Sequence, residues 1–216
     1  MIQQWEETSD RRAIFLNCYM LMTQSVLEAI EAGEFKDSIW VRALLHRFAG
    51  YYFEALGAYE LDSPSTPAVW RLTHDAAREP KTLVLQNLFL GVNAHINYDL
   101  VLTLVDMLEL EWRRLSADQR EQRYSDHCHV NQIIKQTINA VQDVVVERYS
   151  PVMDVVDKIL GPGDEWLTAQ VITDWRDAVW QEALQLLEMG EPNERQRRRE
   201  QIEAVTLKRA KIILLI

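Results

Sequence analysis

His95 and Asp99, four positions apart, carry the strongest chemical signal in the chain. Both lie in a stretch from Thr82 to Leu110 that is otherwise nearly all apolar. Residues at this spacing share one face of an α-helix. An imidazole beside a carboxylate acts as a general base with its orienting partner, or holds a divalent metal such as Zn, Mn or Fe. We therefore expect these two residues to be catalytic, metal-binding, or both.

Other polar residues in this stretch divide between two faces of the expected helix. At ~100° per residue, Asp106 falls within ~20° of His95, whereas Gln86, Asn93 and Asn97 fall together on the opposite face. A polar side chain in a dry core costs a few kcal/mol unless it is hydrogen-bonded, so each needs a partner. Asn93 and Asn97 are therefore expected either to bind a small-molecule substrate or to hold neighbouring helices.

A metal site would need further ligands from other helices. Asp126, on the following long helix, is our third candidate metal ligand, and Asn131 is a further candidate for binding substrate. Additional candidate ligands are His46, His74, Asp75, His127 and His129. The alternative is a buried His–Asp hydrogen bond that only fixes helix packing, as in a non-catalytic binding or interaction module. Metal-assisted hydrolysis, another small-molecule reaction and this alternative all stay open.

Several other chemistries are poorly supported, because their motifs are missing. The chain has no glycine-rich phosphate loop, no G-x-S-x-G elbow, no H-E-x-x-H and no paired C-x-x-C. No histidine has Glu three residues before it, unlike the pairs of a carboxylate-bridged diiron bundle. The net charge of −10 argues against a nucleic-acid partner. Cys18 and Cys128 lack a disulfide framework and are expected to be reduced.

The location predicted from the sequence is cytoplasmic. The N-terminus is acidic and lacks the basic region and apolar run of a signal peptide. The apolar run from Leu83 to Leu110 is long enough to span a bilayer, but it contains His, Asp and Asn residues, which are costly there. We therefore expect no membrane span.

The elements that position these residues are all expected to be helices. A chain of 216 residues with 48% apolar content fits one globular domain, residues 1–216. Its seven Gly and six Pro are too few for a strand-and-turn protein. Apolar residues recur at helical spacing almost throughout. The fold class is therefore all-α, a bundle of about seven to nine helices around a buried central helix.

The helices follow from turn residues and periodicity. They are expected near residues 10–33, 38–59, 67–77, 82–110, 125–149, 151–160 and 166–189. Ser116 is expected to cap a separate short exposed helix or linker, and Gly91 to let another helix come close to the central one. Residues 190–216 begin with a charged segment and end as an apolar helix. This tail should pack on the body or on a second copy, which would make a homodimer.

The octapeptide N-A-H-I-N-Y-D-L, from Asn93, resembles the signature of a helical family of bacterial and fungal proteins, domain-of-unknown-function family 5995. The runs R-F-A-G-Y-Y-F-E-A-L from Arg47 and W-R-D-A-V-W-Q-E-A from Trp175 are similar to it as well, and so is Trp70 in its short helix. The resemblance implies a functional constellation of Asn93, His95, Asn97, Asp99, Asp126 and Asn131. It implies no particular reaction. The function expected is thus a polar pocket, partly buried and centred on His95 and Asp99.

Overall fold

Helices make up most of the computed structural model, which describes residues 1–141, 147–149 and 164–215. In chain order they are α1 (Ile2–Glu7), α2 (Arg12–Glu31), α3 (Ser38–Glu60), α4 (Ala68–Arg78), α5 (Val84–Ala94), η1 (His95–Asp99), α6 (Leu100–Leu108), α7 (Ala117–Val141), α8 (Glu147–Tyr149), α10 (Asp164–Glu188) and α11 (Pro192–Ile213). No strand occurs in the described ranges, and the all-α prediction is confirmed. The helix expected at residues 151–160 lies outside them.

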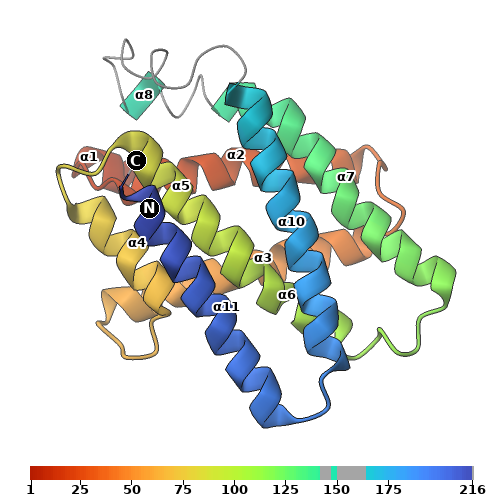
Figure 1. Cartoon of the computed structure of the whole chain (residues 1–216). Coiled ribbons are helices and arrows are strands. Elements are labelled where there is room, and N and C mark those ends of the chain that lie inside the picture. Colours follow the sequence, from red (N-terminus) through yellow and green to blue (C-terminus); the bar gives the residue numbers. More distant parts are fainter. Residues whose placement is uncertain (142–146, 150–163, 216) are drawn as a thin grey trace.

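The expected central helix is the continuous run α5–η1–α6. It packs against α2, α3, α4, α10 and α11, so other helices surround it (Figure 1). Its strongly apolar composition follows from this position, because a helix covered on several sides has no broad solvated face. The bundle therefore encloses the stretch that carries His95 and Asp99.

The five residues of η1 form a π-helical turn, which the sequence pattern did not predict. A π-turn adds one residue to a turn of α-helix and changes the direction of the side chains that follow it. Such turns are rare and often lie at functional sites. Here the turn begins at His95 and ends at Asp99.

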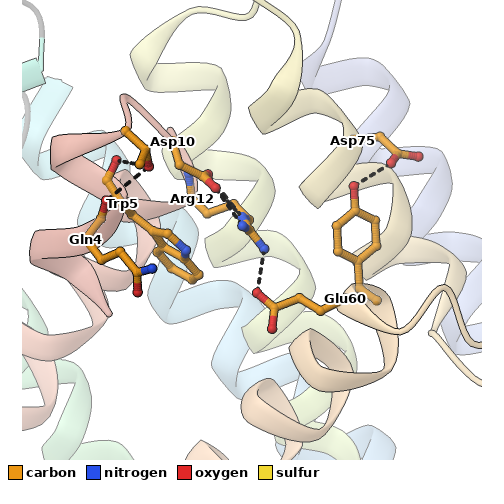
Figure 2. Close-up of polar contacts among 8 residues, drawn as sticks. Gln4, Trp5, Asp10, Arg12, Glu60 and Asp75 are labelled. Carbon is orange, nitrogen blue, oxygen red and sulfur yellow. Dashed lines mark hydrogen bonds and ion pairs between the residues drawn. The ribbon is translucent and has the colours of Figure 1, made fainter.

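Polar contacts tie α2, α3 and α4 together around the central helix. Figure 2 shows Arg12, at the start of α2, reaching Asp10 and Glu60, with ion-pair distances of 2.6 and 3.1 Å. The side chain of Arg12 is only 9% exposed, so water screens these contacts weakly. The hydroxyl of Tyr59, on α3, donates to Asp75 on α4 at 2.8 Å. These contacts hold three of the helices that surround the site.

The C-terminal helix α11 docks on the body, along α4 and α5 (Figure 1). The side-chain amide of Gln86 donates to the carbonyl oxygens of Ile213 (3.3 Å) and Leu214 (3.2 Å). The polar face of the central helix that carries Gln86 is thus used to hold a neighbouring helix.

Ser116 caps a long helix rather than a separate short one. The backbone N–H of Gln119 donates to the Ser116 hydroxyl at 3.2 Å, and the Ser116 N–H donates to the Gln119 side chain at 2.9 Å. This reciprocal capping box starts α7, which continues to Val141. The expectation of a separate short helix or linker is wrong, because no Gly or Pro interrupts the chain between Ser116 and Val141.

The expectation of no membrane span is also wrong. Two helices, Arg12–Glu31 and Val84–Leu108, are long and apolar enough to cross a membrane. The polar residues of the second do not exclude a span, because hydrogen bonds inside the fold remove most of the cost of placing them among apolar groups. Length and composition alone identify candidates, since core helices of soluble proteins meet the same criteria. The fold buries 50% of the first apolar segment and 83% of the second.

Candidate functional site

His95 and Asp99 form a buried hydrogen-bonded pair that is completed by Trp70. The Nδ1 atom of His95 lies 2.9 Å from Oδ2 of Asp99. Across the interface with α4, the indole N–H of Trp70 donates to both carboxylate oxygens of Asp99, at 3.0 Å each. His95, Asp99 and Trp70 are 3%, 1% and 0% exposed. The sequence predicted the pair but not the role of Trp70, which lies on another helix.

The partners of Asp99 determine which nitrogen of His95 carries the proton. Since an indole can only donate, Asp99 accepts from Trp70, and an ionised carboxylate also accepts from Nδ1–H of His95. Burial lowers the pKa of His95, although the hydrogen bond to Asp99 acts the other way. Burial raises the pKa of Asp99, against the hydrogen bonds from His95 and Trp70. With Asp99 ionised, the neutral imidazole donates Nδ1–H to the carboxylate and carries its lone pair on Nε2.

Aromatic rings fix the plane of the imidazole. Phe48 of α3 stacks on His95, with 3.6 Å between ring centroids and 10° between ring planes. Tyr19 and Phe15 of α2 approach edge-on, with centroids at 4.5 and 5.7 Å. A ring clamped in this way keeps one orientation, so the direction of Nε2 is set before any ligand arrives.

A partly enclosed cavity of about 110 Å³ adjoins His95. Its wall is almost wholly apolar and is built from α2, α3, the central helix, α7 and α10. Polar groups enter this wall from His95, Tyr19, Thr23 and Arg176. The Nε2 atom of His95 and the hydroxyls of Tyr19 and Thr23 are buried and lack a hydrogen-bond partner among the described residues. An apolar hollow with a few convergent polar groups is typical of a small-molecule site.

Arg176 is a buried cation in the wall of this cavity, and the sequence interpretation missed it. Its side chain donates from Nε to Oδ1 of Asn131 at 2.6 Å and from Nη2 to the carbonyl oxygen of His127 at 3.2 Å. Asn131, a candidate for binding substrate, thus holds Arg176. The signal that marks Arg176 is its position four residues after Ile172 and four before Trp180, on the apolar face of α10.

Asp126 lies on α7, and its carboxylate contacts the backbone at the start of α3 rather than His95. Its two carboxylate oxygens accept from the backbone N–H groups of Lys36 and Asp37, at 2.8 Å each. The three candidate metal ligands are thus not brought together. Within the described ranges, no group of three or more His, Cys, Asp or Glu side chains is placed to hold a metal ion. The donor set around His95 does not fit a divalent metal.

The other histidines are spread through the bundle. His46 is exposed, and His129 contacts Glu34 at the surface, 3.0 Å away. His74 and His127 are buried, but neither lines the cavity beside His95. These residues do not extend the His95 site.

Asn93 and Asn97 face α11. The side-chain N–H of Asn93 donates to the carbonyl oxygen of Thr206 at 3.1 Å, and that of Asn97 donates to Oδ1 of Asn93 at 3.2 Å. The Thr206 hydroxyl donates to the carbonyl oxygen of Asn97, also at 3.2 Å. Of the two roles expected for these asparagines, these contacts are those of helix packing.

Asp106 lies on the same central helix as His95 but belongs to a separate cluster of contacts with α3. It accepts from the Arg47 guanidinium and from the Tyr51 hydroxyl, both at 2.8 Å. The side chain of Asp106 is 33% exposed, whereas that of Asp99 is 1% exposed. Asp106 therefore takes no part in the buried site.

The protein is an all-helical bundle. A buried histidine, oriented by a carboxylate, lies beside an apolar cavity in it. Over residues 1–216, its whole length, the chain matches the profile of a family described as "Family of unknown function (DUF5995)". The chain belongs to this family, and the resemblance noted in the sequence is confirmed. No curated protein and no solved structure matches it significantly.

Proposed function

We propose that this protein is a small-molecule enzyme in which His95, oriented by Asp99, acts as a general base on a ligand in the adjoining cavity. One observation carries the proposal. The Nδ1 side of the imidazole is held by Asp99, while Nε2 is buried, has no partner among the described residues and belongs to a side chain of the cavity wall.

The chemistry follows from the charge that forms during proton transfer. When Nε2 takes a proton from a ligand or from a water beside it, the imidazole becomes a cation. The adjacent carboxylate of Asp99 stabilises that cation, in the way a buried aspartate supports the base of a catalytic triad. Trp70 holds the carboxylate through both oxygens, so the pair need not reorganise during the reaction. The reactions that fit are hydrolysis by an activated water and proton abstraction from an apolar substrate.

A non-catalytic binding module is the second candidate. The unreactive cysteine in the cavity wall favours it. Cys18 is the cysteine in that wall, and burial raises the pKa of its thiol to about 12, which keeps it protonated and unreactive. In this alternative His95 only accepts a hydrogen bond from a bound ligand. Both candidates predict binding in the same cavity, and turnover separates them.

The test compares His95→Asn with His74→Asn. His74 is a matched control, because its Nε2 is also buried without a partner in the described part of the chain, yet the hollow beside it measures only about 10 Å³. Each variant and the natural protein are assayed for hydrolysis of small aromatic and short-chain esters and amides. Binding of the same compounds is followed by ligand-detected NMR.

Loss of a general base lowers the rate by ~10²–10⁴-fold. The enzyme proposal expects that loss in His95→Asn, with binding and helical content retained and with His74→Asn near the natural rate. Equal turnover in the natural protein and His95→Asn would refute it. Binding without turnover across the panel would leave the binding module as the function.

A further inference from the structure

Arg176 places a positive charge inside the bundle without an acidic partner in the described residues. The residue is 4% exposed, and both of its hydrogen-bond acceptors, Oδ1 of Asn131 and the carbonyl oxygen of His127, are neutral. Asp177 follows it in α10 and attracts its charge but makes no ion pair with it. None of the described hydrogen bonds of Arg176 uses Nη1.

Arg123 shows how this chain normally treats a buried guanidinium. The side chain of Arg123 is 12% exposed and pairs with two carboxylates, Asp37 at 2.6 Å and Glu111 at 3.0 Å. A buried ion without a counter-charge is costly, because neutral dipoles replace only part of its hydration. Burial accordingly lowers the pKa of Arg176 to about 10. A charge kept at this cost beside a cavity is explained by a ligand that neutralises it.

We propose that the cavity binds a monocarboxylate with a small apolar body, whose carboxylate pairs with Arg176. This proposal rests on the proposed function only in that both place a ligand in the same cavity. It adds the chemical class of that ligand. Guanidinium and carboxylate make parallel, charge-assisted hydrogen bonds, and the pair is neutral as a whole. The apolar body would contact Val130, Ile134 and Ile172, which line the cavity together with Arg176.

The volume limits the body of the ligand. An apolar cavity of ~150 Å³ in another protein binds benzene. The cavity here, of about 110 Å³, is smaller, so a phenyl ring is the upper limit for the apolar group and a short alkyl chain fits more easily. A phosphate monoester is disfavoured, because its second negative charge would enter an apolar wall that offers a single guanidinium.

The experiment is calorimetry with benzoate, benzyl alcohol and phenyl phosphate, three probes that share one ring and differ in charge. In the natural protein we expect benzoate to bind at least ~10-fold more tightly than benzyl alcohol, with phenyl phosphate weaker than benzoate. Arg176→Met keeps a long side chain and removes the charge. In that variant the advantage of benzoate should fall to about onefold, while benzyl alcohol still binds.

Arg209→Met is the matched control. Arg209 is a partly buried arginine on α11 that stacks on Trp175, makes no ion pair with the residues described, and lies outside this cavity. Arg209→Met should leave the advantage of benzoate over benzyl alcohol unchanged. Equal affinity for benzoate and benzyl alcohol in the natural protein would overturn the proposal even if Arg176→Met fails to fold. An advantage that survives in folded Arg176→Met, or tighter binding of phenyl phosphate than of benzoate, would overturn it as well.

His95→Asn separates this proposal from the enzyme proposal. It keeps Arg176, so benzoate should retain its advantage over benzyl alcohol in this variant. If turnover never depends on His95 but the charge preference depends on Arg176, the base is refuted and the carboxylate site stands. If His95→Asn abolishes turnover and Arg176→Met has no effect on the charge preference, the base stands and the carboxylate site is refuted.

Discussion

The Nδ1 atom of His95 lies 2.9 Å from Oδ2 of Asp99, and both side chains are buried within a single π-helical turn. This relationship predicts the tautomer of the histidine. In Asp99→Asn, the amide oxygen still accepts from Trp70, which turns the amide N–H₂ toward Nδ1. The proton of His95 should then move to Nε2, and the base should be lost. The nitrogen chemical shifts of His95 in NMR spectra report which of the two ring nitrogens carries the proton.

The same substitution should lower the free energy of unfolding by about 1–3 kcal/mol, because a hydrogen bond to a charged group is replaced by a neutral one. Asp106→Asn is the control, since Asp106 contacts Arg47 and Tyr51 rather than His95. It should leave the His95 signals unchanged. A His95 that keeps its proton on Nδ1 in Asp99→Asn would contradict the assignment.

Stability should decrease in acid, because three histidines are buried in neutral form. Burial lowers the pKa of His95 and His127, and it lowers that of His74 to about 3. The unfolded chain binds protons at these residues below pH ~6.5, whereas the folded chain does not. Each residue therefore stabilises the fold above pH ~6.5, and this contribution is lost as the pH falls toward the folded-state pKa. For His74 the expected slope is ~1.4 kcal/mol per pH unit between its unfolded and folded pKa values.

His74→Phe isolates one of these contributions. Phe keeps an aromatic ring against Trp70 but cannot bind a proton, so the slope between pH 6 and 4 should decrease by ~1.4 kcal/mol per pH unit. Urea unfolding at several pH values measures this slope of the free energy of unfolding. Identical slopes in His74→Phe and the natural protein would refute a buried neutral His74.

The sequence sufficed for features that depend on local spacing. The central helix and the His95–Asp99 pair follow from the period of one helix, since residues four apart meet wherever that helix lies. Helix packing was only one of the roles that the sequence left open for the face that carries Gln86, Asn93 and Asn97.

Features that depend on contacts between helices were not predictable from spacing. Trp70 and Arg176 reach the site from α4 and α10, and no periodicity within α5 indicates where those helices pack. Asp126 was assigned to the site because it is acidic and lies on the following long helix, and because the family resemblance included it. Only the packing of α7 against the start of α3 shows that it binds backbone N–H groups instead. The π-turn also escaped prediction, because helical periodicity assumes one rise and twist throughout.

Asp126 should stabilise the fold without affecting the cavity. Its carboxylate is 2% exposed and accepts from the N–H groups of Lys36 and Asp37. Asp126→Ala leaves both donors without that partner, so the free energy of unfolding should fall by about 2–4 kcal/mol. Asp126→Asn keeps one acceptor and should lose about half as much. Denaturant unfolding measures both, and a changed affinity for benzoate in either folded variant would contradict the separation.

At Gly91 the central helix packs close against Phe15 of α2, and this contact offers a sharp packing test. A Cβ atom added at Gly91 would lie 2.3 Å from Cγ and 2.7 Å from Cβ of Phe15, whose ring contacts His95. Gly91→Ala should therefore destabilise the protein by about 1–3 kcal/mol or more, despite the higher helix propensity of Ala. Gly57→Ala, also in a helix, meets no atom within 4 Å and should stabilise it by up to ~1 kcal/mol. Thermal unfolding of the two variants gives the comparison. A Gly91→Ala protein as stable as Gly57→Ala would show that α2 is not packed against the central helix in this way.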